Sequence, residues 1–171
     1  MYSSEIFYTG FEISPQAYEL CQKIKKDNIN FYLEDFSKIE NCFFDVILFI
    51  DVIEHIEDVF GFLRKVKDKG KYKIFHIPLD MFVLNIMKGS NLSNGVIYPG
   101  HIHFFTKDVA LEMLKTYGYE ILDFFYTPGF ELPKKTLLSK IVRIPQKICY
   151  ILNNDLLIRV FGGVSLLVLT K

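Results

Sequence analysis

The chain has 171 residues, half of them hydrophobic, with 20 basic and 20 acidic side chains and a formal net charge of zero. This length and composition predict a single folded domain and exclude a disordered tail. The balanced charge gives no reason to expect a nucleic-acid partner. Three widely spaced cysteines fit neither a disulfide framework nor a zinc site, which favours a cytoplasmic location. No signal peptide and no membrane-spanning run is expected.

The first half of the chain alternates between strand and helix patterns. The apolar run Ile6 to Ile13 predicts a buried strand, and Ser14 followed by Pro15 predicts the start of a helix. The next elements predicted are a strand at 30–33, a strand at 44–50, a helix at 52–66 and a strand at 72–77. The run at 44–50 is typical of a strand covered on both faces. This alternation predicts a parallel sheet in an α/β fold.

The pattern loosens after residue 78. Residues 79–100 contain an apolar patch and two turn-rich segments, and residues 101–105 favour a short extended strand. Further along, the sequence predicts a helix at 107–117 capped by Thr106, strands at 119–126 and 164–170, and a largely helical segment at 130–161. The basic amphipathic part of that segment, 134–147, is interpreted as a lid over the active site. The alternative is peripheral contact with an anionic membrane.

Acidic residues follow three of the predicted strands. Glu12 ends the first strand, Asp35 lies just past the second, and Asp51 ends the third. Ligands in open α/β sheets bind outside the carboxyl ends of the strands, and an acid there can accept both ribose hydroxyls. Each acid alone could instead cap the next helix or face solvent. Three at successive strand ends favour a nucleoside site.

Several short motifs occur along the chain, most of them at or near the ends of the predicted strands. They are Gly10-Phe11-Glu12-Ile13-Ser14, Glu34-Asp35-Phe36, Phe44-Asp45-Val46-Ile47, Asp51-Val52-Ile53-Glu54-His55 and Gly100-His101-Ile102-His103-Phe104. In this order, from about residue 6 to 126, they resemble class I S-adenosylmethionine-dependent methyltransferases. The resemblance implies a Rossmann-like methyltransferase fold, with a mostly parallel sheet and an antiparallel C-terminal strand. It also implies S-adenosylmethionine as cofactor.

The resemblance assigns roles to individual residues. Glu12 would hold the ribose and Ile13 would lie against the adenine, whose amino group Asp35 would bind, with Phe36 beside the ring. At the third strand, Ile50 would line the pocket near the methionine part of the cofactor. Asp51 and His55 would face the space between cofactor and acceptor.

One feature departs from the family. A glycine-rich turn normally precedes the ribose acid by about twenty residues, and Glu12 leaves no room for it in this sequence. The first strand and helix of the fold would then be missing, and residues 1–171 would be a truncated single domain. Weak cofactor binding is therefore expected, and a non-catalytic, degenerate relative remains an alternative. A nicotinamide-dependent enzyme is a third, weaker hypothesis.

The histidines are the remaining candidates for chemistry. His55 is a candidate general base, and His101 is expected to lie near it on the acceptor side. A structural hydrogen bond is expected for His103, and His76 is interpreted as a satisfied core histidine. No third ligand stands out beside His101 and His103, so no metal site is predicted. The predicted reaction is methyl transfer to an oxygen or nitrogen of a small molecule, for example a sugar or a lipid-linked sugar.

Overall fold

The computed structural model describes residues 6–128 and 154–171, which belong to two compact units. We call them the N-terminal unit, Met1–Cys42, and the C-terminal unit, Phe43–Lys171, and describe each by itself. The predicted lid at 130–161 falls mostly on residues 129–153, outside the described residues. Its described end is helix α7 (Asn154–Phe161). None of the helices in the described ranges is long and apolar enough to cross a membrane.

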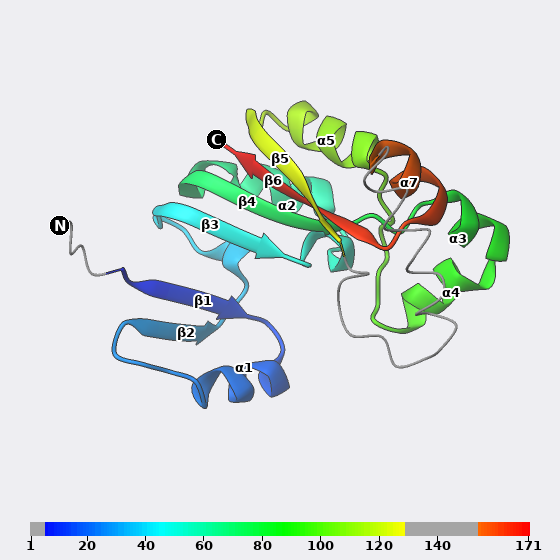
Figure 1. The fold of residues 1–171 in the computed structure, drawn as a ribbon. Helices are drawn as coiled ribbons and strands as arrows, with labels where there is room; N and C mark the ends of the chain where they lie inside the picture. Colours follow the sequence, from blue (N-terminus) through cyan, green and yellow to red (C-terminus); the bar gives the residue numbers. More distant parts are fainter. Residues whose placement is uncertain (1–5, 129–153) are drawn as a thin grey trace. The chain divides into compact units, whose positions relative to one another are not determined.

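The N-terminal unit is a two-stranded parallel sheet with one helix (Figure 1). Its elements are β1 (Tyr8–Glu12), α1 (Pro15–Gln22), β2 (Ile29–Leu33) and the 3-10 helix η1 (Phe36–Lys38). The Ser14 side chain accepts a hydrogen bond from the Ala17 backbone, so the predicted cap is confirmed. Glu12 pairs with Leu33 in the parallel register, so both strands end at the same edge.

The C-terminal unit contains a four-stranded sheet in the order β3-β4-β6-β5 (Figure 1). Its strands are β3 (Phe44–Ile50), β4 (Gly70–Pro78), β5 (Ile121–Pro128) and β6 (Val164–Thr170). Strand β3 runs parallel to β4, and β6 runs antiparallel to both β4 and β5. The predicted fold class is therefore confirmed.

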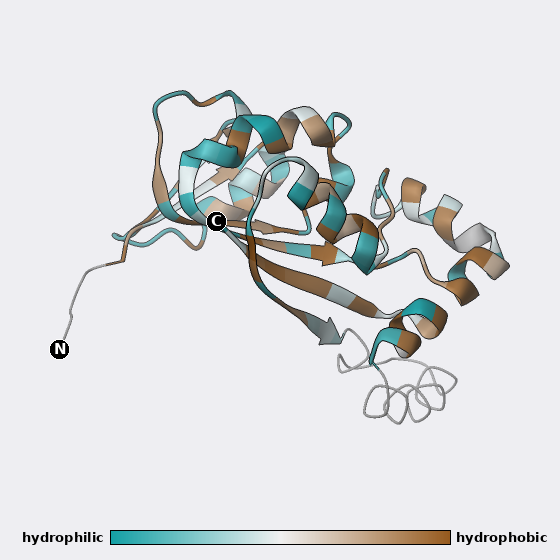
Figure 2. Cartoon of the chain, turned by 90° about the horizontal axis from the view of Figure 1, so that it is seen from above, coloured by the Kyte–Doolittle hydropathy of each residue, from teal (hydrophilic) through white to brown (hydrophobic). Residues whose placement is uncertain are grey.

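The core of the C-terminal unit lies between one face of this sheet and the helices α2 (Val59–Val66) and α5 (Lys107–Thr116). The ring of Phe75 is fully buried, and it packs on Phe49 and on Tyr119 at centroid distances of 5.0 and 5.4 Å. The Tyr119 hydroxyl donates to the Leu63 carbonyl at 2.8 Å, which ties α2 to the segment after α5. In Figure 2 the helices alternate between hydrophilic and hydrophobic colours, as expected for helices with one face on a core.

Four details differ from the sequence prediction. The pattern at 52–66 is not one helix, because Asp58 caps a new start at α2 after the 3-10 helix η2 (Ile53–His55). Residues 79–100 form α3 (Val83–Lys88) and α4 (Ser90–Ile97) rather than turns.

Residues 101–105 form no strand, because their backbone amides bond to single loop carbonyls and not to a ladder. Within the C-terminal unit taken by itself, strand β3 is covered on one face only. Ile47 and Phe49 are buried, whereas Val46, Leu48 and Ile50 are exposed.

Candidate active site

The carboxyl end of β3 carries a strained residue. Asp51 has a φ of 51°, a conformation that costs energy for a residue with a side chain and that is enriched at functional sites. Its carboxylate lies 2.6 Å from Nδ1 of His76, and Nε2 of His76 lies 2.8 Å from the Thr127 hydroxyl. Both ring nitrogens of His76 are thus satisfied, as predicted. These contacts fix the Asp51 side chain at the end of the sheet.

Two loops meet just beyond Asp51. The backbone carbonyl of Glu54 accepts hydrogen bonds from the amides of Ile102 and His103 at 2.9 and 3.1 Å. The His103 ring adds a bond from Nε2 to the Ile56 carbonyl at 2.8 Å. The structural role predicted for His103 is therefore confirmed. These hydrogen bonds place His101, the residue before Ile102, opposite η2.

His55 and His101 face each other across this junction, with ring centroids 4.9 Å apart. The predicted proximity of the two rings is confirmed, and their catalytic roles stay predictions. Nδ1 of His55 lies 3.0 Å from the Gly100 carbonyl, and Nδ1 of His101 lies 2.8 Å from the Asp80 carboxylate. Both partners are acceptors, so each Nδ1 carries a proton. In the neutral ring, each Nε2 then holds a free lone pair.

Glu54 lies under this histidine pair. Its side chain is 0% exposed, and neither carboxylate oxygen has a hydrogen-bond partner among the described residues. Nε2 of His55 and Nε2 of His101 each lie 3.9 Å from Oε1 of Glu54. Burial raises the pKa of Glu54 above its ordinary value, and it outweighs the lowering effects of Glu54's own backbone amide and of the two histidines. Glu54, His55 and His101 together form what we call the Glu–His–His cluster.

Glu54 lies within one of the sequence motifs, but no role was predicted for it. A signal was present, since Glu54 is an acid between the apolar residues Ile53 and Ile56 in a segment with helical periodicity. Asp80 was also missed, although it comes two residues after a strand that ends at Pro78. Its partner lies 21 residues further along the chain, a contact that no local pattern reveals.

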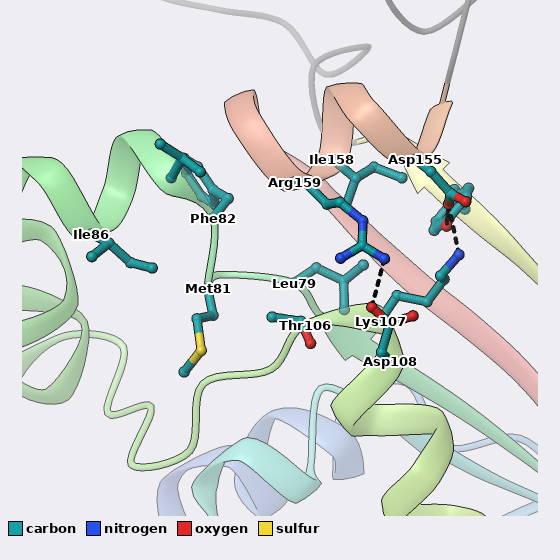
Figure 3. Close-up of a pocket in the computed structure, with 12 residues that line it drawn as sticks. Leu79, Met81, Phe82, Ile86, Thr106, Lys107, Asp108, Asp155, Ile158 and Arg159 are labelled. Atoms are coloured by element: carbon teal, nitrogen blue, oxygen red, sulfur yellow. Dashed lines mark hydrogen bonds and ion pairs between the residues drawn. The ribbon is translucent and has the colours of Figure 1, made fainter.

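A cavity of about 350 Å³ opens in the same unit. Its apolar walls include Leu79, Met81, Phe82, Ile86 and Ile158, seen in Figure 3. Two of the lining residues, Leu79 and Met81, flank Asp80 in the chain, and the Asp80 carboxylate holds His101.

Two ion pairs hold α7 beside this cavity. Lys107 contacts Asp155 at 2.7 Å, and Arg159 contacts Asp108 at 2.7 Å (Figure 3). The Tyr126 hydroxyl also donates to Asp155. The hydrogen bonds from Lys107 and Tyr126 lower the pKa of Asp155. The cavity therefore has apolar walls and a charged rim.

The predicted nucleoside residues lie in the N-terminal unit. One oxygen of Glu12 accepts from the Ser14 amide at 2.8 Å, and one oxygen of Asp35 accepts from the Ser37 amide at 2.9 Å. Partial burial acts to raise the pKa of Asp35, but hydrogen bonds from Ser37 and Lys38 hold it below the ordinary value. Each acid thus caps the turn that follows it. This agrees with the alternative that an acid at a strand end only caps the next element. Both lie at one edge of the two-stranded sheet.

The apolar candidates are placed as follows. Ile13 is exposed, and Phe36 packs on Phe11 at a centroid distance of 5.1 Å. In the C-terminal unit, Ile50 is 48% exposed at the end of β3, next to Asp51. Exposed apolar side chains at strand ends are compatible with a ligand site. The cofactor roles of these residues remain predictions.

Comparison with known proteins gives the family. Residues 5–123 match a family model described as a methyltransferase domain. No curated protein sequence matches the chain significantly.

Several solved structures have the same fold. A SAM-dependent methyltransferase from Thermotoga maritima superposes with a TM-score of 0.63 at 15% identity, covering 96% of this chain and 72% of that one. Magnesium protoporphyrin IX methyltransferase from Synechocystis PCC 6803, solved with bound SAH, gives 0.58 at 13% identity. That match covers 96% of this chain and 64% of the Synechocystis enzyme. The [4+2]-cyclase SpnF gives 0.61 at 12% identity, with 99% and 68% covered.

The family match covers the motifs on which the resemblance rested, from Glu12 to His101. The solved methyltransferases superpose over nearly the whole of this chain, at TM-scores of 0.58 and 0.63. Both findings confirm the resemblance to S-adenosylmethionine-dependent enzymes. The chain belongs to the methyltransferase domain family and has its Rossmann-like fold.

Proposed function

We propose that this protein transfers a methyl group from S-adenosylmethionine to an oxygen or nitrogen atom of a small-molecule acceptor. The observation that carries the proposal is the pair His55 and His101, whose free Nε2 lone pairs meet beside Asp51 at the end of β3. In α/β sheets of this kind, ligands bind at that end of the strands. Family membership supplies the reaction type.

The cofactor, when bound, supplies an electrophilic methyl group on a sulfonium sulfur. In the N-terminal unit, Glu12 and Asp35 would accept hydrogen bonds from the nucleoside, and Ile13 and Phe36 would contact the adenine. In the C-terminal unit, Ile50 would line the pocket near the methionine part, and Asp51 would face the space between cofactor and acceptor. These assignments rest on the resemblance and on the position of each residue at a strand end.

The protein's chemical task on the acceptor side is to accept a proton. Nε2 of His55 would take the proton from the acceptor hydroxyl or amine while the acceptor's lone pair forms the bond to the methyl carbon and the methyl–sulfur bond breaks, which leaves S-adenosylhomocysteine. His101 orients the acceptor through its own Nε2, with its ring held by Asp80. Since the His55 side chain is 36% exposed, an acceptor can approach its ring.

The acceptor should have both an apolar and a polar part. The cavity of the C-terminal unit offers apolar walls from α3 and α7, and a rim formed by Lys107, Asp108 and Arg159. A sugar with an apolar substituent, such as a lipid-linked sugar, fits these surroundings. Its lipid would bring the protein into peripheral contact with a membrane, without a spanning segment.

Calorimetric titration with S-adenosylhomocysteine tests the cofactor part of the proposal. Micromolar binding that is lost in Glu12→Ala but kept in His101→Ala supports it, because His101 is assigned to the acceptor side. Undetectable binding by the wild-type chain would favour the non-catalytic alternative. With a panel of hydroxyl and amine acceptors, His55→Ala should then slow methyl transfer about 10²–10⁴-fold.

A further inference from the structure

The Glu–His–His cluster has the composition of a metal site. Oε1 of Glu54 and one imidazole nitrogen from each histidine all lie within 4.8 Å of one another. Glu54 comes from the loop after β3, and His101 comes from the segment after α4. We propose that these three side chains bind one divalent transition-metal ion. This site is not evident from the sequence, where the nearest partner for His101 is His103, whose ring bonds elsewhere.

The first supporting observation is the orientation of the two rings. The Gly100 carbonyl and the Asp80 carboxylate hold the Nδ1 protons of His55 and His101. Metal-binding histidines characteristically donate one ring N–H to a carbonyl or carboxylate, which fixes the tautomer and directs the other nitrogen to the metal. Both histidines of the cluster have this arrangement. Their Nε2 atoms both lie on the side of Glu54.

A second, independent observation is the state of the Glu54 carboxylate. It is completely buried, and neither of its oxygens has a hydrogen-bond partner among the described residues. A buried carboxylate without hydrogen bonds is unfavourable unless it is paired with a cation or protonated. A bound metal ion supplies that missing partner. The site therefore explains a polar group that the rest of the described structure leaves unsatisfied.

The distances require only a small adjustment. Nitrogen and oxygen ligands lie about 2.0–2.2 Å from a zinc-like ion, so neighbouring ligand atoms are roughly 3.0–3.5 Å apart. Each Nε2 is now 3.9 Å from Oε1 of Glu54. The His55 ring is the more exposed of the two, and a small rotation of its side chain would bring Nε2 closer. Three protein ligands leave further coordination positions for water or an acceptor oxygen.

The ligand types indicate which ions fit. Two imidazoles and one carboxylate suit Mn²⁺, Fe²⁺, Co²⁺ or Zn²⁺, whereas Mg²⁺ and Ca²⁺ prefer oxygen ligands throughout. In the metal-bound form the lone pairs of both imidazoles are bound to the ion. An acceptor oxygen would then contact the ion, where in the metal-free form it would contact His55. The inference goes beyond the proposed function, because metal binding needs neither cofactor nor acceptor.

Calorimetric titration of the full chain with Mn²⁺ tests the site, with Mg²⁺ for comparison. Mn²⁺ is a better probe than Zn²⁺, because Zn²⁺ would also bind the cysteine thiolates of the chain, whereas Mn²⁺ has little affinity for thiolates. We expect one saturable Mn²⁺ site per chain, at least tenfold tighter than any Mg²⁺ binding, and a rise in melting temperature on adding Mn²⁺. Glu54→Gln, which keeps the side-chain volume, and His55→Ala should both abolish binding.

His103→Gln is the matched control, since His103 lies two residues from His101 but uses its Nε2 on the Ile56 carbonyl. It should bind Mn²⁺ as the wild type does. Circular dichroism checks that each variant is folded, and His55 is exposed enough for its replacement to be tolerated. No saturable Mn²⁺ binding by the wild type would overturn the proposal, as would binding that survives in folded Glu54→Gln and His55→Ala. Methyl transfer by the imidazole pair would be unaffected by that result.

Discussion

The N-terminal and C-terminal units are built from equally apolar strands, but they bury very different amounts of them. None of the described residues 6–42 is buried, and Tyr8, Ile13 and Leu33 are all exposed. In the C-terminal unit, four strands and two covering helices bury a continuous core around Phe75 and Leu63. Two strands and a short helix cannot enclose a side chain on all sides, whereas a larger sheet with helices on one face can.

The same difference applies to the candidate site residues. Glu12 and Asp35 are held by amides only two residues away in the chain. His55 is held by a carbonyl 45 residues away, and His101 by a carboxylate 21 residues away. Local hydrogen bonds of the first kind form in many turns, folded or not. The long-range hydrogen bonds that hold His55 and His101 form only when the C-terminal unit is folded. The geometry of the Glu–His–His cluster should therefore be lost when that unit unfolds.

The largest expected effect separates the two cores directly. Phe75→Ala removes a fully buried ring that packs on Phe49 and Tyr119, and it should lower the free energy of unfolding by about 3–5 kcal/mol. Phe11→Ala, in the half-buried surface of the N-terminal unit, should lower it by about 1 kcal/mol. Guanidinium denaturation of both variants measures the difference. Equal losses would show that the N-terminal unit has a core of its own.

A smaller effect is expected for a single buried hydrogen bond. Tyr119→Phe deletes the hydroxyl that donates to the Leu63 carbonyl and leaves that carbonyl unsatisfied, at a cost of about 1–2 kcal/mol. The matched change in the N-terminal unit is Tyr32→Phe, at an exposed position that should be nearly neutral. Urea denaturation of the pair measures both costs. A neutral Tyr119→Phe would contradict the role given to this bond.

The smallest expected effect is a dependence of stability on alkaline pH. Burial, together with the hydrogen bond to Asp155, raises the pKa of Tyr126 from 10.0 to about 12. Between these values the unfolded chain loses the proton while the folded chain keeps it. The folded state therefore binds more protons, and stability falls as pH rises from about 10 to about 12.

Denaturation of wild type and Tyr126→Phe at a series of pH values isolates this contribution. The difference in the free energy of unfolding between the two proteins should be constant just below about pH 9. It should become smaller as pH rises from about 10 to about 12. Tyr119, whose pKa burial also raises, is present in both proteins and cancels. A difference that does not change with pH would show that Tyr126 is solvated like a surface tyrosine.

Much of the fold follows from local patterns. The apolar runs predicted all six strands of the two units, and Ser14 and Thr106 were identified as helix caps because a side-chain oxygen there meets an amide three residues on. Predictions from such patterns were wrong where another local signal decided the structure. Asp58 starts a new helix inside an otherwise helical period, and the polar stretch after Gly89 forms α4 despite its turn-like composition.

The sequence by itself predicted that Glu12, Asp35 and Asp51 each lie at or just past the carboxyl end of a strand, because the apolar runs that form those strands stop there. It also predicted that His55 and His101 would be neighbours, through the resemblance. Only the tertiary structure decided that Glu54 points into the interior without a partner, and that Asp80 and Gly100 orient the two rings. Those contacts join residues 21 to 45 positions apart, and their geometry depends on how the loops pack rather than on any local period.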